Sequence, residues 1–196
     1  MVHTLSKTDG PASLDGVTHL DMGLSWDTST GGSGGLLGKL KERIGSDLDG
    51  IGILMEGDKP TGYVGLDNLD PCENGSVTHS GDNTTGRGSG DDETVMLRLT
   101  DVPRDVTSIL LVAAAFKPGS DMKRAKNIKV KVYDKTGGTS EQVAVIKPSL
   151  LSTKNVLAIA RINRVGDAWY LDLVDDEYAV KPGDFGQLLR GAINMR

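Results

Sequence analysis

The densest group of side chains that could bind a cation lies in the run from His79 to Glu93. Its two ends carry carboxylate or amide side chains at Asp82, Asn83, Asp91, Asp92 and Glu93. Glycines recur between these ends and allow backbone turns that would be strained for other residues. Hard cations take six to eight oxygens, from carboxylates and from backbone carbonyls that such a loop can turn inward. The residue types therefore predict either a calcium site or a solvated acidic turn.

A second acidic group precedes the apolar run from Ile51 to Met55. If a strand begins here, Asp47 and Asp49 lie on one face, because successive side chains of a strand alternate. Such a pair is either a ligand pair or a solvent-facing edge. Asp27, from a nearby loop, and Asn68 offer further oxygens. An EF-hand is excluded, because the run Asp47-x-Asp49-Gly50 lacks the third ligand.

Other chemistries find less support. The histidines are isolated and no His-x-x-x-His or Cys-x-x-Cys spacing occurs, so a zinc site is not expected. There is no Gly-x-Ser-x-Gly elbow and no Walker A sequence. His79 is a candidate general base, and the alternative is a loop histidine bonded to the backbone. The single Cys72 rules out an internal disulfide and is expected to be an idle exposed thiol.

Composition narrows the function class. The 196 residues carry a net charge of -5, and only 4% are aromatic. Both values disfavour nucleic acid as the main partner. The longest apolar run, from Ile109 to Phe116, is too short to span a membrane, and the first residues do not resemble a signal peptide. We therefore expect a soluble, cytoplasmic protein with no transmembrane segment.

Alternation of apolar and polar residues predicts mostly β-strands. Val95 to Leu99 and Ile128 to Val132 alternate with period two, whereas Ile109 to Phe116 is continuously apolar, as in a central strand buried on both faces. Further strands are expected at 51–55, 142–146, 156–162 and 169–174, the last two joined by a hairpin loop at 163–167. The pattern predicts an all-β protein, a β-sandwich of two mostly antiparallel sheets with a few short peripheral helices.

Two helices and one charged stretch complete the expected architecture of a single domain over residues 1–196. Leu36 to Ile44 has helical spacing, and Asp184 is placed to cap a C-terminal helix that begins at Phe185. The basic stretch from Lys123 to Lys131 predicts either contact with anionic lipid or nucleic acid, or a strand whose polar face is rich in lysine. Lysines on such a strand also discourage edge-to-edge aggregation.

The run from Ser76 to Glu93 resembles the signature of the TerD family of tellurium-resistance and stress proteins. Shorter motifs of the family also occur elsewhere in the chain, in the order in which the family has them. They are Gly23-Leu24-Ser25-Trp26-Asp27, Asp47-Leu48-Asp49 and Val102-Pro103-Arg104-Asp105-Val106. The resemblance covers nearly the whole chain and is weaker in the final third.

The resemblance implies a β-sandwich that binds calcium through acidic loops at one end. It also implies a non-enzymatic role in tellurite resistance, stress response or development, with protein partners in a membrane-associated stress complex. The ligand set it implies is Asp27, Asp47, Asp49, Asn68, Asp82, Asn83, Asp91, Asp92 and Glu93, with backbone carbonyls near Thr84, Gly86 and Gly88.

The chain also departs from the family pattern. Arg87 and Ser89 stand where many relatives carry acids, which should weaken a cation site. Ala115-Phe116-Lys117 replaces a common Ile-His-Glu/Asp pattern after the central strand. Two alternatives to the calcium module therefore stay open: a metal-dependent hydrolase that uses the same carboxylates around two ions, and a metal-free structural adaptor.

Overall fold

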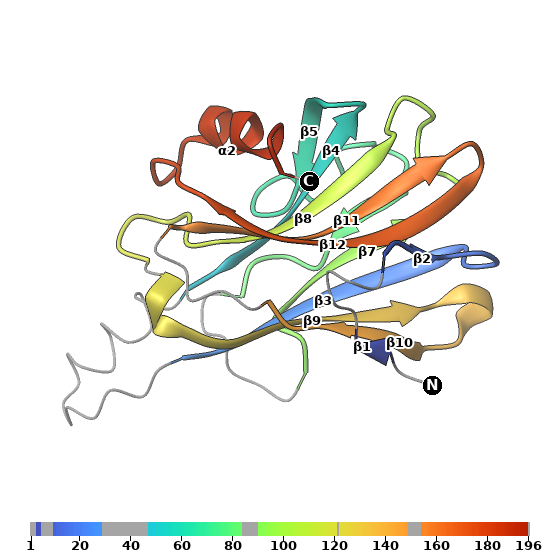
Figure 1. Ribbon diagram of the computed structural model, residues 1–196, viewed down its shortest axis with the longest axis horizontal. Helices are drawn as coiled ribbons and strands as arrows, with labels where there is room; N and C mark the ends of the chain where they lie inside the picture. The colour runs from blue at the N-terminus through green and yellow to red at the C-terminus, as the bar shows by residue number, and fades with distance from the viewer. Residues whose placement is uncertain are drawn as a thin grey trace.

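Two six-stranded β-sheets form the molecule (Figure 1). The computed structural model describes residues 3–4, 10–28, 47–83, 90–120, 122–148 and 154–195. The first sheet contains, in spatial order, β1 (His3–Thr4), β10 (Glu141–Ile146), β9 (Ala125–Asp134), β3 (His19–Thr28), β7 (Glu93–Arg98) and β6 (Val77–His79). The second contains β2 (Ala12–Ser13), β12 (Ala168–Tyr178), β11 (Val156–Val165), β8 (Ser108–Ala114), β4 (Asp49–Glu56) and β5 (Lys59–Val64).

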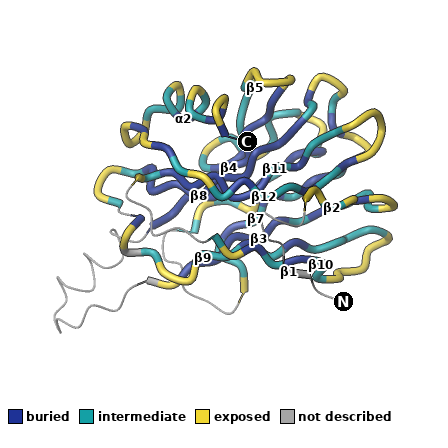
Figure 2. The backbone as a smooth tube through the Cα atoms, viewed as in Figure 1, coloured by how far each residue is buried: buried dark blue, intermediate teal, exposed yellow. Residues whose placement is uncertain are grey.

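The predicted β-sandwich with mostly antiparallel sheets is confirmed. Within the described ranges, β1 and β10 are the one parallel pair, and the other neighbouring strands run antiparallel. The tube view shows burial concentrated along the strands of both sheets, with exposure at the connecting turns (Figure 2). No helix among the described residues is long and apolar enough to cross a membrane.

The central strand β8 is buried at all seven positions, as its continuous apolar sequence predicts. One face packs into the core between the sheets, through Ile109, Leu111 and Ala113. The other face, through Leu110 and Val112, belongs to a second apolar cluster on the outer side of its sheet. A strand covered on both faces loses the alternation that marks a half-exposed strand.

The C-terminal helix α2 (Phe185–Ala192) covers that outer face (Figure 1). Its predicted cap is confirmed, because the Asp184 carboxylate accepts a hydrogen bond from the Gln187 N–H at 2.9 Å. Leu188 and Ala192 are its buried residues, and the Tyr178 hydroxyl donates to the Leu188 carbonyl at 3.1 Å. The other described helical segments are the 3-10 turns η1 (Met122–Arg124) and η2 (Thr136–Gly138). The helix expected at Leu36 to Ile44 lies outside the described residues.

Two expectations about strands are wrong in detail. The β11–β12 hairpin has a two-residue turn rather than a loop over 163–167, because Val165 pairs with Ala168. Gly166 has φ +63°, which suits such a short turn. The expected lysine-rich strand is confirmed as β9, but its lysines do not protect an edge, since β9 pairs with β10 on one side and β3 on the other.

Candidate metal centre

Acidic side chains converge where strand ends from both sheets meet. Glu93 begins β7 in the first sheet, and Asp49 begins β4 in the second. Leu24 of β3 pairs with Glu93, and Gly50 donates its N–H to Glu93 Oε2 at 2.7 Å, which joins the two sheets at this point. Asp82 follows β6 along the chain. One oxygen each from Asp49, Asp82 and Glu93 lie within 4.8 Å of one another.

The pair Asp47 and Asp49 is buried, so the alternative of a solvent-facing edge is wrong. Asp49 is 0% exposed, and Asp47 is 6% exposed. Within the part of the chain that the structure describes, neither Asp49 oxygen has a hydrogen-bond partner, and Asp47 Oδ1 has none either. A buried carboxylate without partners is costly unless a cation neutralises it.

A lysine ammonium lies among these carboxylates. Lys117 Nζ is 2.7 Å from Asp82 Oδ2, 3.2 Å from Asp47 Oδ2 and 3.8 Å from Asp49 Oδ1. The antiparallel pairing of Asp49 with Ala114 explains the placement, because the residues after β8 must then run beside those before β4. The cluster thus carries an internal positive charge.

The preceding residue, Phe116, anchors this lysine. Its ring packs against Phe185 of α2 at 4.6 Å between centroids, and its carbonyl accepts the Gly183 N–H. Phe116 is therefore fixed in the outer apolar cluster, while the side chain of Lys117 reaches the carboxylates. Its side chain remains 35% exposed, so the ammonium borders solvent.

Glu93 is held in place by backbone and by a histidine. Its Oε1 accepts the Asn83 N–H at 3.0 Å, and its Oε2 accepts from Gly50. His79 Nε2 lies 3.5 Å from Glu93 Oε2, while His79 Nδ1 accepts the Gly81 N–H at 3.1 Å. A Cβ at Gly50 would lie 3.2 Å from Glu93 Oε2, so a larger residue there would press on this carboxylate. These contacts orient a buried carboxylate towards the cluster.

Burial dominates the acid–base behaviour of the site. It raises the pKa of Asp49 to about 7, and the attraction of Lys117 offsets this only in part. Burial likewise raises the pKa of Asp47, against the hydrogen bond from Lys117. Burial alone would lower the pKa of Lys117, but hydrogen bonds to Asp82 and Asp47 raise it overall. A divalent cation would favour the ionised form of these carboxyl groups.

The three consecutive acids point to different places. Lys131 Nζ donates to Asp91 Oδ1 at 2.8 Å, which places Asp91 outside the cluster of Asp49, Asp82 and Glu93. Gly23 makes room for this arrangement, because a Cβ at that position would overlap the Asp91 carboxylate.

Asp92 lies between these two environments. The Trp26 N–H donates to its Oδ2 at 3.0 Å, and Asn83 Nδ2 donates to its Oδ1 at 3.3 Å. Burial raises the pKa of Asp92, although the Trp26 hydrogen bond opposes the rise. Asp91, Asp92 and Glu93 thus have different partners, although the charges of Glu93 and Asp91 still contribute to the raised pKa of Asp92.

The remaining predicted ligands lie elsewhere or outside the described residues. Asp27 belongs to β3 rather than to a loop, and its Oδ2 accepts from Asn127 Nδ2 at 2.6 Å. Asn68 closes a turn, where its Nδ2 donates to the Tyr63 carbonyl at 2.8 Å. Thr84, Gly86 and Gly88 fall within 84–89, which the structure does not describe.

Lys117 is absent from the ligand set inferred from the sequence, because its role depends on the pairing of β4 with β8. His79 is also absent from that set, although its position beside the acidic run marks it as a candidate base. It is the last residue of strand β6 and is buried, so it is not a loop histidine, but its ring accepts a backbone N–H as that alternative predicts.

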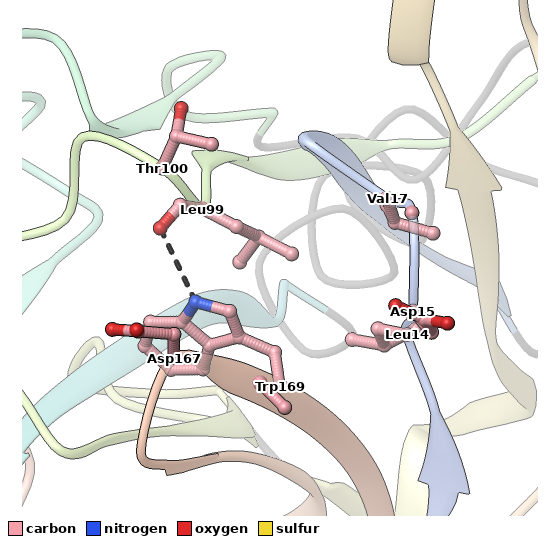
Figure 3. A pocket seen from close by; sticks show the side chains of 9 residues that line it. Leu14, Asp15, Val17, Leu99, Thr100, Asp167 and Trp169 are labelled. Carbon is pink, nitrogen blue, oxygen red and sulfur yellow. Dashed lines mark hydrogen bonds between the residues drawn. The ribbon is translucent and has the colours of Figure 1, made fainter.

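A small hollow lies at the other end of the strands, where β7 ends (Figure 3). It measures about 120 Å³, and Asp15, Leu99, Asp167 and Trp169 are among its lining residues. The Trp169 Nε1–H donates to the Leu99 carbonyl at 3.2 Å, as the dashed line marks. Small-molecule pockets usually occupy about 300–1,000 Å³, so this hollow serves to seat the indole.

Comparison with known proteins shows the family of this chain. The family model described as "TerD domain" matches residues 1–182. The chain belongs to the TerD family. It is 30% identical over 164 residues to stress response protein SCP2 of Bacillus subtilis, covering 79% of this chain and 80% of that protein. It is 31% identical over 157 residues to the tellurium resistance protein TerZ of Serratia marcescens, covering 78% and 77%.

Solved structures show the same TerD fold. A crystal structure of a TerD homologue from Streptomyces coelicolor A3(2) matches with a TM-score of 0.64 at 19% identity, over 85% of this chain and 94% of that one. A second crystal structure, of a protein of unknown function, matches with a TM-score of 0.67 at 18% identity, over 87% and 95%. At these identities the likeness concerns the fold of this TerD-family chain.

Proposed function

We propose that this TerD-family protein is a calcium-binding, non-enzymatic module of a stress response such as tellurite resistance. The observation that carries the proposal is Asp49, a fully buried carboxylate with both oxygens unpartnered beside Asp82 and Glu93. The relatives named for tellurium resistance or stress response support the cellular role.

The donor set fits a hard cation. The cluster offers carboxylate oxygens, which Ca²⁺ and Mg²⁺ prefer over zinc and other softer metals. Ca²⁺–oxygen distances are about 2.3–2.6 Å, so two ligands of one ion lie at most about 5 Å apart. The separation of at most 4.8 Å between the three oxygens satisfies that limit. Asp49, Asp82 and Glu93 would hold the ion, and Asp47 would face it from the same side.

Calcium is favoured over magnesium by the shape of the site. Mg²⁺ demands near-ideal octahedral geometry and keeps several waters, whereas Ca²⁺ accepts irregular sets of protein oxygens. Here two carboxylates are buried and one is exposed, and they come from three separate segments.

The ammonium of Lys117 competes with calcium for the carboxylates. In the metal-free protein its ammonium partly neutralises Asp47, Asp49 and Asp82, so the cluster is less unstable than four acids alone would be. One ammonium still leaves an excess of negative charge over the four carboxylates. Calcium entry would draw Lys117 away towards solvent, which its partial exposure permits. We propose that this rearranged end of the sandwich contacts protein partners.

Thermal unfolding with and without metal tests the proposal. The protein is first unfolded in excess EDTA, and then Ca²⁺ and Mg²⁺ are titrated separately. A ligand held only by the native state stabilises it by about 2.7 kcal/mol at a hundredfold excess over Kd. For a chain of this size the midpoint should rise by roughly 5–10 °C with Ca²⁺. No rise with either ion would favour a metal-free adaptor, and metal-dependent turnover of phosphoesters would favour a hydrolase.

The cellular role needs its own test. A bacterium whose own TerD-family gene is deleted is complemented with the wild-type chain or with Asp49→Asn. The proposal predicts that the wild-type chain restores growth on tellurite and that Asp49→Asn does not. Equal growth with both would separate the stress role from the acidic cluster.

A further inference from the structure

A second cavity, larger than the hollow beside Trp169, is lined by positively charged side chains. It measures about 790 Å³ and draws on both sheets, through β9 of the first and Leu157 of β11 in the second. Its volume falls in the usual range for small-molecule sites. The lining residues are Asp27, Lys123, Ala125, Lys126, Asn127, Ile128, Lys129, Lys147, Pro148 and Leu157.

The cavity concentrates positive charge in an acidic protein. Among the described residues, four lysines and one carboxylate line it, although the chain as a whole carries a net charge of -5. The carboxylate, Asp27, accepts a hydrogen bond from Asn127 rather than an ion pair from a lysine. Among the described residues no carboxylate forms an ion pair with Lys126, Lys129 or Lys147.

A neighbouring lysine outside the cavity does have a carboxylate partner. Lys131, two residues beyond Lys129 on the same strand, donates to Asp91. Lys147 directly follows Ile146, the last residue of β10, which pairs with Val130, so Lys147 lies just beyond the end of β10 on the side of Lys129. Like charges that lie close together repel one another, so an anion bound between them would be favoured. Edge protection does not account for them, because β9 is paired on both sides.

The apolar part of the lining indicates the shape of the ligand. Ala125, Ile128, Pro148 and Leu157 add aliphatic surface to the lining that the lysines share. No aromatic side chain lines the cavity among the described residues, so the stacking surface that nucleobases use is missing. A concave site suits a molecule that enters it better than it suits a flat bilayer.

We propose that this cavity binds an organic phosphate that carries an aliphatic body. The phosphate would take hydrogen bonds from the lysine ammonium groups, and the aliphatic part would cover the apolar floor. The proposal does not depend on calcium, because it uses none of the residues of the Asp49 cluster.

Octyl phosphate is the probe for this site, titrated calorimetrically into the full-length protein in EDTA. We expect micromolar binding of octyl phosphate, at least about tenfold weaker binding of inorganic phosphate, and no detectable binding of octan-1-ol. The Lys126→Gln/Lys147→Gln variant should bind octyl phosphate about tenfold more weakly or worse. Both lysines are exposed, so the fold should persist, and circular dichroism checks this.

A matched control separates the cavity from overall charge. Lys59→Gln/Arg190→Gln removes two positive charges from β5 and α2, outside the cavity, and should leave the affinity unchanged. Equal loss in both double variants, or no binding of octyl phosphate at about 1 mM, would overturn the proposal. Binding to phosphatidic acid vesicles without binding of octyl phosphate would also overturn it, in favour of a membrane surface.

Discussion

The ammonium of Lys117 lies 3.8 Å from Asp49 Oδ1, close enough to attract the carboxylate but too far to hydrogen-bond to it. Asp49 therefore keeps both oxygens free of hydrogen bonds while it is fully buried. The Asp49 carboxylate is therefore available to a metal cation, which would contact it more closely than the Lys117 ammonium does. The metal-binding account rests on that availability.

Replacement of Lys117 by methionine should strengthen calcium binding. The variant removes the competing charge and keeps most of the aliphatic stem, so we expect about tenfold lower Kd for Ca²⁺. In EDTA the same variant should be less stable than the wild type, by about 1–2 kcal/mol, since the buried carboxylates lose their counter-charge. Calorimetric titration and urea unfolding measure the two effects.

Lys59→Met is the control for that experiment, because Lys59 is exposed on β5 and has no part in the cluster. Unchanged calcium affinity in Lys117→Met would mean that the ammonium does not compete with the ion. Weaker affinity would mean that Lys117 supports the site rather than opposing the metal.

Asp49→Asn and Asp91→Asn should behave differently although both remove one acid from the family's ligand set. Asp49→Asn should abolish the calcium-dependent rise in Tm, because the ion loses its most buried ligand. Asp91→Asn should retain that rise, since Asp91 pairs with Lys131 away from the cluster. Equal loss of the calcium effect in the two variants would contradict this division.

The sequence predicts much of the fold and the carboxylates of the cluster, but not Lys117. The continuous apolar run of β8, the cap at Asp184 and the Asp47–Asp49 pair follow from local pattern alone. Strand β3 was missed, although Leu20, Met22, Leu24 and Trp26 alternate with period two and are all buried. Gly23 and Ser25 lie between these residues and made the alternation harder to recognise as a strand.

The contacts of the site depend on tertiary pairing. The opposition of Asp49 to Ala114 brings Lys117 to the carboxylates, and no local spacing encodes that. The separation of Asp91 from Glu93 depends on Gly23 in a neighbouring strand. Composition therefore indicates a cation site, but the register of the sheets decides which residues come together in it.

The metal-free protein should lose stability as the pH rises from about 4 to 7. The pKa of Asp49 is raised to about 7 in the folded state, against about 3.9 for an unfolded aspartate. The folded chain therefore binds the extra proton in this window, and its stability advantage is lost as the pH passes the folded-state pKa. The raised pKa values of Asp47 and Asp92 act in the same direction.

Chemical unfolding in EDTA at several pH values measures this effect, and Asp49→Asn isolates it. The difference in unfolding free energy between the wild type and Asp49→Asn should shrink or reverse as the pH rises to 8. A difference that is constant across this range would show that Asp49 titrates normally.

Gly23→Ala should destabilise the fold without removing the cation site. A Cβ at residue 23 would overlap the Asp91 carboxylate, so Asp91 must leave Lys131 or the strands must shift. Overpacking of this kind typically costs about 1–3 kcal/mol. Urea unfolding should show that loss, while the calcium-dependent rise in Tm persists. Loss of the calcium effect as well would tie Asp91 to the metal.

The most direct test of calcium binding at the acidic cluster is calorimetric titration of Ca²⁺ into the metal-free wild type and Asp49→Asn. The account predicts saturable binding to the wild type and at least about a hundredfold weaker binding to Asp49→Asn, since a buried carboxylate ligand is lost. No binding to the wild type, or equal binding to both proteins, would contradict the account.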